Sequence, residues 1–526
     1  MSSNDLSGRG VPWKMIRSTC IPRSHEPGRV STGNGGLDDI LGGGLEAERV
    51  YLLEGRPGTG KTTLALQFLI EGARRGDRCL YVTLSESERE LRAVAAGHGW
   101  DLDGIDVFEL VPAEASLDPE QELTLFHPAE MELGETVKRI LDRVVEANPK
   151  RVVFDSLSEM RLLAQSSLRY RRQILALKGF FAGRQCTLVL VDDLSSREND
   201  LQLHSIAHGV VALEQLALDY GAERRRLRVV KMRGMSYRGG YHDFTIERGG
   251  LAIYPRLIAA EHHKAFLGEM TSTGSPQLDA LLGGGIERGT STLLIGGAGV
   301  GKSSIALTYV MAAAGRGETA VVFGFDEGLG TVFARAAGLG MPLQAHVDTG
   351  QVQVQQIDPA EMSPGEFAHR VRHSVEKDGA RVVVIDSLNG YLNSMPEERF
   401  LVLQMHELLS YLNQLGVVTI LILAQHGLMG PLQTPLDISY LSDAVLILRY
   451  FEAEGRVRRA ISVVKKRSSA HEDAIREFRL TAAGITVGPP LIEFQGILSG
   501  APSYRGALNP LLPAGDLPTD THASDE

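Results

Sequence analysis

The sequence has only three cysteines, Cys20, Cys79 and Cys186, in 526 residues. Their wide spacing fits neither a disulfide framework nor a zinc site, so we interpret them as reduced thiols. No apolar run approaches the roughly 18 residues that a membrane-spanning helix needs, and the N-terminal stretch has no apolar segment of the kind that a secretory signal requires. We therefore expect a cytoplasmic protein without a membrane segment.

Basic residues are also in deficit. Lys and Arg number 54 against 65 Asp and Glu, which gives a net charge of −11 and a pI near 5.8. This balance argues against a protein whose main task is to coat nucleic acid. The hydrophobic fraction of 43% and the charged fraction of 23% are those of an ordinary globular protein. The length predicts more than one domain, because one domain takes roughly 150 residues.

The chain contains an internal repeat. Residues 31–63 read STGNGGLDDILGGGLEAERVYLLEGRPGTGKTT, and residues 272–304 read STGSPQLDALLGGGIERGTSTLLIGGAGVGKSS. The matching lysines, Lys61 and Lys302, are 302 − 61 = 241 residues apart. This period is far too long for a solenoid repeat, so a whole domain is duplicated.

The repeat predicts the domain organisation. We expect an N-terminal extension over residues 1–25, a first domain over 26–255, a second domain over 256–487 and a C-terminal tail over 488–526. The strand-like segment FTIERGGLAIY is expected to close the first domain, and the overlapping segment GGLAIYPRLIAAEHH, with its glycines and proline, is the expected linker. The Pro-containing, acidic tail is interpreted as a flexible end, either bare and solvated or used for docking.

Strand-like and helix-like segments alternate within each copy. RVYLLEG, CLYVTL, RVVFDSL and CTLVLV read as buried parallel strands, as do STLLIGG, AVVFGF, RVVVID and VVTILILA in the second copy. Helical spacing follows the first strand of each copy. The pattern predicts an α/β fold in which each domain has a mostly parallel sheet flanked by helices.

Each copy also has a glycine-rich segment between a strand and a helix. Residues 55–62 read GRPGTGKT and residues 296–303 read GGAGVGKS, and both match G-x-x-x-x-G-K-[ST]. The alternative, a chance glycine-rich turn, is disfavoured by this context and by the repetition. We predict two P-loops that bind ATP through Gly55, Gly58, Thr59, Gly60, Lys61, Thr62 and Thr63, and through Gly296, Gly299, Val300, Gly301, Lys302, Ser303 and Ser304.

Acidic residues follow two further strands of each copy. Asp155 and Asp386 end hydrophobic strands, and we predict that they bind Mg²⁺ together with the hydroxyls of Thr62 and Ser303. An aspartate there could instead cap a helix. Glu86 follows CLYVTL, and the pair Asp326 and Glu327 follows AVVFGF. These carboxylates are candidates to orient or deprotonate water, the alternative being solvated acidic loops.

The ordered, duplicated set of motifs resembles the KaiC family of RecA-like ATPases from about residue 28 to 505. The resemblance rests on STG…LD…LGGG, both P-loops, the acids after AVVFGF and CLYVTL, the DSL strands, VVK-x-R and HEDAIREF. It implies two tandem RecA-like domains in an ATP-dependent homohexamer with nucleotide between subunits. It also implies Glu86, Asp326 and Glu327 as catalytic bases. The family's usual Glu-Glu pair is Ser85-Glu86 in one copy and Asp326-Glu327 in the other, so we expect hydrolysis to be affected in both domains and the first domain to be the weaker.

Basic residues on a late strand of each copy match residues that reach the neighbouring subunit's γ-phosphate in this family. They are Lys231 and Arg233 in the first copy and Lys465 and Arg467 in the second. Their chemical role would be to neutralise charge on the transferred phosphoryl group. Without the resemblance, a basic edge strand is more simply a solvated face.

The family's second domain phosphorylates itself on a Ser-Thr pair. By the resemblance, that pair falls on Ser439 and Tyr440, and Thr434 matches another nearby hydroxyl. Ser439 is thus the expected phosphorylation site, although a loop serine is often only a turn residue. We interpret the chain as an ATPase with serine autokinase activity, which acts with partners in signalling or circadian-type timing. The alternatives are an ATP-driven switch without kinase activity and a RecA-like DNA-binding motor, which the acidic charge disfavours.

Overall fold

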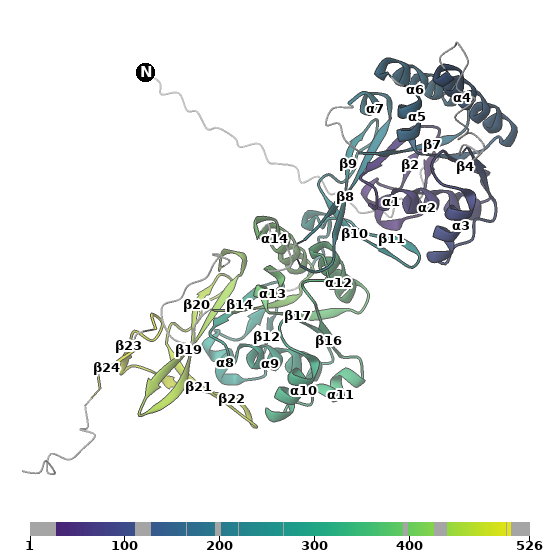
Figure 1. Ribbon diagram of the computed structural model, residues 1–526. Coiled ribbons are helices and arrows are strands. Elements are labelled where there is room, and N and C mark those ends of the chain that lie inside the picture. Colours follow the sequence, from purple (N-terminus) through teal and green to yellow (C-terminus); the bar gives the residue numbers. More distant parts are fainter. Residues whose placement is uncertain are drawn as a thin grey trace, which may run out of the picture. The chain divides into compact units, whose positions relative to one another are not determined.

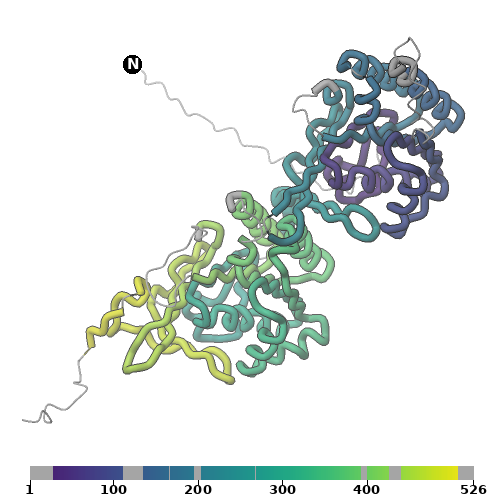
Figure 2. The backbone as a smooth tube through the Cα atoms, viewed as in Figure 1, coloured from purple at the N-terminus to yellow at the C-terminus, as the bar shows by residue number. Residues whose placement is uncertain are grey.

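The computed structural model describes residues 28–110, 128–164, 166–194, 201–218, 220–266, 268–392, 398–425, 439–500 and 502–506, and Figure 2 draws residues of certain placement in colour. The side chains of residues 128–133, 201–202, 398–399 and 439 lie outside this description. The described residues form two compact units, the first mainly up to Ile253 and the second mainly from Tyr254 onward. The expected N-terminal extension over 1–25 lies outside the described residues, and the division at residues 255 and 256 stays a prediction.

The first unit is built around a nine-stranded sheet, with strand order β11-β10-β9-β8-β3-β7-β6-β4-β5 in the part of the chain that is described. The pairs from β5 through β4, β6, β7 and β3 to β8 are parallel, whereas β9 and β10 are antiparallel. The strands of this region are β1 (Arg29–Val30), β2 (Leu45–Glu46), β3 (Val50–Gly55), β4 (Cys79–Thr83), β5 (Ile105–Glu109), β6 (Arg151–Asp155), β7 (Thr187–Asp193), β8 (Gly209–Leu216), β9 (Arg224–Met232), β10 (His242–Glu247) and β11 (Gly250–Tyr254).

Helices cover both faces of this sheet (Figure 1). The first helices lie on one face and α4 to α6 on the other, so parallel strands are buried on both sides, as their unbroken apolar sequences require. The helices are α1 (Gly35–Ile40), α2 (Lys61–Arg74), α3 (Glu88–Gly97), α4 (Pro128–Ala147), α5 (Leu157–Ala164), α6 (Ser167–Phe181) and α7 (Leu201–Ile206).

The second unit repeats this plan. In the described chain its nine-stranded sheet has the order β16-β15-β17-β18-β14-β19-β20-β21-β22, parallel from β16 to β19 and antiparallel beyond. The strands are β12 (Met270–Thr271), β13 (Ile286–Glu287), β14 (Ser291–Gly296), β15 (Thr319–Gly324), β16 (Val352–Gln356), β17 (Ala380–Asp386), β18 (Val418–Ala424), β19 (Ala444–Ala453), β20 (Arg456–Lys466), β21 (Arg476–Thr481), β22 (Gly484–Pro490), β23 (Phe494–Gln495) and β24 (Ser503–Tyr504).

Its helices again lie on both faces, α8 to α11 on one and α12 to α14 on the other (Figure 1). They are η3 (Ala259–Glu261), α8 (Pro276–Leu281), α9 (Lys302–Gly315), α10 (Leu329–Gly338), α11 (Leu343–Asp348), α12 (Pro364–Glu376), α13 (Leu388–Leu392), α14 (Glu398–Gln414) and η4 (Ser439–Leu441).

Successive residues of one central strand show how the two apolar layers form. In β17, Val382 and Val384 pack into the layer under α8 to α10, while Val383 and Ile385 pack into the layer under α12 to α14. All four side chains are at most 1% exposed. A strand with period 2 and both faces buried must be apolar at every position, which explains the run RVVVID. The predicted α/β fold with mostly parallel sheets is confirmed.

Two segments differ from the expected organisation. The first half of the expected linker, Gly250–Tyr254, is strand β11 and not a connection. The turn between β10 and β11 contains Gly249 and Gly250, whose φ values are 105° and 104°. Glycine adopts this left-handed backbone without steric cost, which explains why two glycines stand there. The described start of the expected tail is also packed, because Ile497, with Leu491 and Phe494, contacts buried Phe451 and Ala460. Apolar residues among prolines and glycines gave a weak signal for this packing.

None of the described helices combines the length and the apolar character needed to cross a membrane.

Candidate active sites

Each P-loop follows the central strand of its sheet and leads into a buried helix. In the first unit β3 ends at Gly55 and α2 begins at Lys61, with Gly60 as its N-cap at φ 96°. A side chain at position 60 would come within 2.8 Å of Ile246. In the second unit Gly301 caps α9 at φ 114°, and a side chain there would come within 2.7 Å of Leu480. These glycines let the loop curl with its N–H groups at the positive helix end, which fits phosphate binding.

The other P-loop residues divide into backbone and side-chain roles. Val300 is fully buried in the apolar core, so it can offer a nucleotide only its backbone. Thr59 is also fully buried, and its hydroxyl donates to the Arg56 carbonyl at 2.8 Å. Thr63 and Ser304 lie buried in the first helical turn, where the Thr63 hydroxyl is 3.5 Å from His98 Nε2. Their predicted contact with ATP stays a prediction.

The two P-loop lysines have different partners. Lys61 Nζ lies 2.6 Å from Asp193 Oδ1 and donates to the Arg56 carbonyl at 3.0 Å. Lys302 Nζ donates to the carbonyls of Gly296 and Gly297 at 2.9 and 2.8 Å, and burial lowers the pKa of Lys302. A partly desolvated ammonium held by carbonyls is ready to exchange them for phosphate oxygens.

The residues expected to bind Mg²⁺ lie together in both units. The Thr62 hydroxyl donates to Asp155 Oδ2 at 3.0 Å, and Ser303 makes the matching hydrogen bond to Asp386. Burial raises the pKa of both aspartates. Because burying a carboxylate costs free energy unless a cation compensates it, a hydroxyl and a buried carboxylate at the P-loop fit a hard cation such as Mg²⁺. That cation would neutralise phosphate charge when it is bound.

The catalytic carboxylates differ between the sites. Glu86 is anchored by Thr83, whose hydroxyl donates to the Glu86 carbonyl at 2.7 Å, and Glu86 Oε2 is buried without a hydrogen-bond partner within the described residues. Burial raises the pKa of Glu86, and the charge of Asp155 adds to the effect. A buried carboxylate oxygen that nothing else occupies can accept a proton from water.

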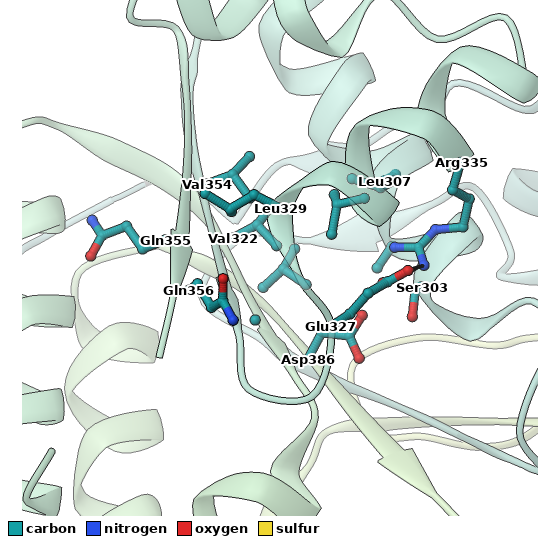
Figure 3. Close-up of a pocket in the computed structure, with 14 residues that line it drawn as sticks. Ser303, Leu307, Val322, Glu327, Leu329, Arg335, Val354, Gln355, Gln356 and Asp386 are labelled. Carbon is teal, nitrogen blue, oxygen red and sulfur yellow. Dashed lines mark hydrogen bonds and ion pairs between the residues drawn. The ribbon is translucent and has the colours of Figure 1, made fainter. Parts of the chain in front are cut away.

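In the second unit both acids are engaged. Ser387 Oγ donates to Asp326, and Arg335 of α10 binds both carboxylate oxygens of Glu327, one of them at 2.6 Å. Figure 3 shows the Arg335 side chain directed at Glu327 across the pocket that Ser303 and Asp386 also line. Arg335 thus occupies an acceptor site on each carboxylate oxygen of Glu327, which leaves fewer sites for a catalytic water than Glu86 has.

Replacing Arg335 by alanine is expected to raise ATP hydrolysis by the second domain about tenfold, because a positioned carboxylate base contributes about 10²–10⁴-fold when it is available. The rate is measured as phosphate release in a Lys61→Ala background, which removes the first P-loop lysine. Arg370→Ala is the matched control, since Arg370 also pairs with a glutamate, Glu366, on a helix. A rate that stays constant or falls would mean that Arg335 supports catalysis.

The predicted basic residues lie away from the P-loop strand of their own sheet. β9 is separated from β3 by β8, and β20 is separated from β14 by β19. Lys231 donates to the Ala207 carbonyl at 3.0 Å and Arg233 to the Ser205 carbonyl at 2.8 Å. In the second unit Lys465 donates to the Ser442 carbonyl at 2.8 Å and Arg467 to the Tyr440 carbonyl at 3.2 Å. Both pairs thus bind backbone carbonyls just before the start of the adjacent strand, β8 in the first unit and β19 in the second.

The expected phosphorylation segment is only partly described. Ser439 begins η4, but its side chain, like all of Thr434, lies outside the described residues. Tyr440 is 52% exposed.

Three site residues were missed by the sequence prediction. The Tyr81 hydroxyl donates to Asp155 Oδ2 at 2.6 Å, whereas Val322 stands at the matching position in β15, 241 residues later. Asp193 and Arg335 were missed as well. The only signal in the sequence is a polar residue in one copy where the other copy has an aliphatic or small one.

The two sheets, each with a P-loop after its central strand and an acid at the end of the strand two positions away, define a tandem RecA-like P-loop ATPase. The family model described as the KaiC ATPase matches residues 30–258 and again 271–492. The chain therefore belongs to the KaiC family.

Curated relatives agree with this assignment. The chain is 27% identical over 488 residues to the circadian clock protein KaiC3 of Synechocystis, and the aligned region covers 90% of this chain and 95% of the relative. It is 26% identical over 473 residues to the circadian clock oscillator protein KaiC of Synechococcus elongatus, with 89% and 90% covered. The KaiC of Acaryochloris marina is 26% identical over 474 residues, with 89% and 90% covered.

Proposed function

We propose that the chain binds MgATP in both domains, hydrolyses it, and phosphorylates itself on Ser439 in the second domain. It acts in signalling or circadian-type timing in the cytoplasm, as an ATP-dependent homohexamer with clock or signalling partners. The observation that carries the proposal is the repetition, in both units, of a P-loop lysine beside a hydroxyl that donates to a buried aspartate. Membership of the KaiC family and the names of the relatives support the timing role.

The difference between the carboxylates supports a division of labour. In the first domain Glu86 has a buried oxygen without a partner in the described chain, which suits water activation and hydrolysis. In the second domain Arg335 holds Glu327, so ATP would survive longer against water and remain available to a hydroxyl of the protein. Phosphotransfer therefore belongs to the second domain.

In the proposed homohexamer, the basic residues at the ends of β9 and β20 would have a catalytic role. Lys231, Arg233, Lys465 and Arg467 would turn from the carbonyls that they bind to the phosphates of the neighbouring subunit's nucleotide. A cation near the transferred phosphoryl group stabilises the charge of the transition state.

Labelling with γ-labelled ATP and mapping of the phosphorylated residue test this function. Wild-type protein is expected to carry label on Ser439, Lys61→Ala to keep it, and Lys302→Ala and Ser439→Ala to lose it. Retained label on Ser439 in Lys302→Ala would overturn the assignment of phosphotransfer to the second P-loop. Label on Tyr440 or Thr434 alone would move the site.

A second candidate function is an ATP-driven conformational switch without kinase activity. It is favoured by the basic residues, because exchange of the Ser442 and Tyr440 carbonyls for a phosphate would release the segment that joins η4 to β19. This function predicts hydrolysis and altered assembly without phosphoprotein, and unchanged behaviour of Ser439→Ala.

A further inference from the structure

Within the described chain, a carboxylate forms an ion pair with the P-loop lysine of the first domain and not with that of the second. Asp193 Oδ1 lies 2.6 Å from Lys61 Nζ, and the lysine side chain is only 7% exposed. Asp193 is the last residue of β7, where it pairs in register with Gly55, the first glycine of the P-loop. In the second sheet, the residue that pairs with the equivalent glycine, Gly296, is Ala424. The carboxylate is therefore a feature of one site and not of the shared fold.

The neighbouring residues hold this carboxylate at the site. The Asp193 N–H donates to Ser158 Oγ at 3.2 Å, which fixes the end of β7. The adjacent carboxylate, Asp192, is neutralised separately, because Arg161 donates to it at 2.6 Å. Since successive side chains of a strand point to opposite faces, Asp193 alone of the two is directed at Lys61.

Negative charge accumulates at the first site. The charge of Asp193 acts on both Asp155 and Glu86, which are the expected metal and catalytic acids. The second site has Arg335 beside its acids, whereas the matching position of the first copy, 241 residues earlier, is Val94. Among the described residues, a further anion at the first site thus meets more repulsion and fewer cations.

We propose that Asp193 is a specificity residue that makes the first-domain site favour a nucleoside diphosphate over a nucleoside triphosphate. This inference rests on the proposed function, because it requires that the first P-loop binds nucleotide. A P-loop lysine serves the β- and γ-phosphates. A diphosphate carries less charge and engages Lys61 with its β-phosphate alone, so Asp193 can keep a contact with the lysine. A triphosphate must take the lysine from Asp193 and then lie beside an unneutralised carboxylate.

Equilibrium binding tests the inference on the full chain carrying Lys302→Ala, so that the first site provides the signal. The probes are MgADP and a non-hydrolysable MgATP analogue, each measured by titration calorimetry. Adding Asp193→Asn is expected to tighten binding of the analogue about tenfold and to change binding of MgADP by less than about threefold. Asp192→Asn removes the same charge one residue away and is expected to leave the ratio of the two affinities unchanged.

Four results would overturn the inference. The affinity ratio could stay constant in Asp193→Asn, or the analogue could bind more weakly, which would make Asp193 a supporting ligand of the triphosphate. Loss of both probes in Asp193→Asn, with binding retained in Asp192→Asn, would assign Asp193 to the structure of the loop. Failure of the Lys302→Ala parent to bind either probe would instead refute the proposed function of the first P-loop, and the inference with it.

Discussion

Replacing Glu86 by glutamine is expected to lower ATP hydrolysis by the first domain about 10²–10⁴-fold, the contribution of a positioned general base. Glutamine keeps the size of the side chain and removes its capacity to take a proton. Phosphate release is measured in a Lys302→Ala background, so that hydrolysis at the second P-loop does not contribute. Glu327→Gln in a Lys61→Ala background is expected to change the rate of the second domain much less, because Arg335 already occupies that carboxylate.

The geometry of Glu86 gives the reason for this size of effect. Its backbone is fixed on both sides by Thr83, which donates to the Glu86 carbonyl and accepts from the Glu86 N–H at 3.1 Å. Gly324 stands at the position of Thr83 in the second copy, so this anchor is absent there. A base held in one position by two hydrogen bonds loses little entropy when it engages water.

The pH dependence of ATP hydrolysis by the first domain should reflect the ionisation of Glu86. Burial raises the pKa of Glu86, with a further contribution from the charge of Asp155. A general base works only when ionised, so hydrolysis falls as the pH drops through this raised pKa and recovers above it. The acid limb of the profile should therefore lie above the ordinary pKa of a glutamate, which is about 4.3.

A control and a contrary result complete this test. Glu88→Gln makes the same chemical change two residues along, at a side chain that pairs with Arg92 on the surface, and should leave the rate unchanged. Equal loss in Glu86→Gln and Glu88→Gln would show a general effect of charge near α3. An undiminished rate in Glu86→Gln would remove Glu86 from the mechanism.

The fold was predictable because the same order of strand-like and helix-like segments occurs in both copies of the repeat. The inner strands β6, β7, β17 and β18 appear as apolar runs, because burial on both faces admits little else. The half-buried parallel edge strands β5 and β16, with the sequences IDVFE and VQVQQ, gave no such signal. The glycines and lysines of the P-loops were predictable for a related reason, since left-handed φ at Gly60 and Gly301 leaves few alternatives. Local constraints of this kind can be read from the chain directly.

The contacts that each catalytic group makes could not be predicted from the sequence in this way. Arg335 of α10 reaches back to Glu327, which precedes the helix, and Asp193 reaches Lys61 from another strand, so both contacts depend on how the chain is folded around the site. The family pattern drew attention to the missing first acid at Ser85, and the first site was expected to be the weaker in hydrolysis. The geometry supports the opposite order, because Glu86 has a free buried oxygen in the described chain and Glu327 does not.

Replacing Arg151 by alanine is expected to destabilise the first domain by about 3–5 kcal/mol, the usual cost of breaking a buried, hydrogen-bonded ion pair. Arg151 is 2% exposed at the start of β6. Its Nη1 donates to the carbonyls of Ser31 and Phe68 at 2.8 and 2.9 Å, and its Nε donates to Asp77 at 3.0 Å. The guanidinium also lies 4.9 Å from the centre of the Phe68 ring. One side chain thus joins the sheet, α2 and the segment before α1.

The control comes from β17, the strand of the second sheet that corresponds to β6. Arg381 lies near the start of β17 but is exposed, so Arg381→Ala should change stability by less than about 0.5 kcal/mol. The free-energy loss in Arg151→Ala corresponds to a fall of about 6–20 °C in the melting temperature of a domain of this size, measured by calorimetry. Because Arg151 lies outside the P-loop, nucleotide should restore part of the lost stability by binding the folded state. If Arg151→Ala and Arg381→Ala melted together, the buried network would contribute no more to stability than an exposed side chain.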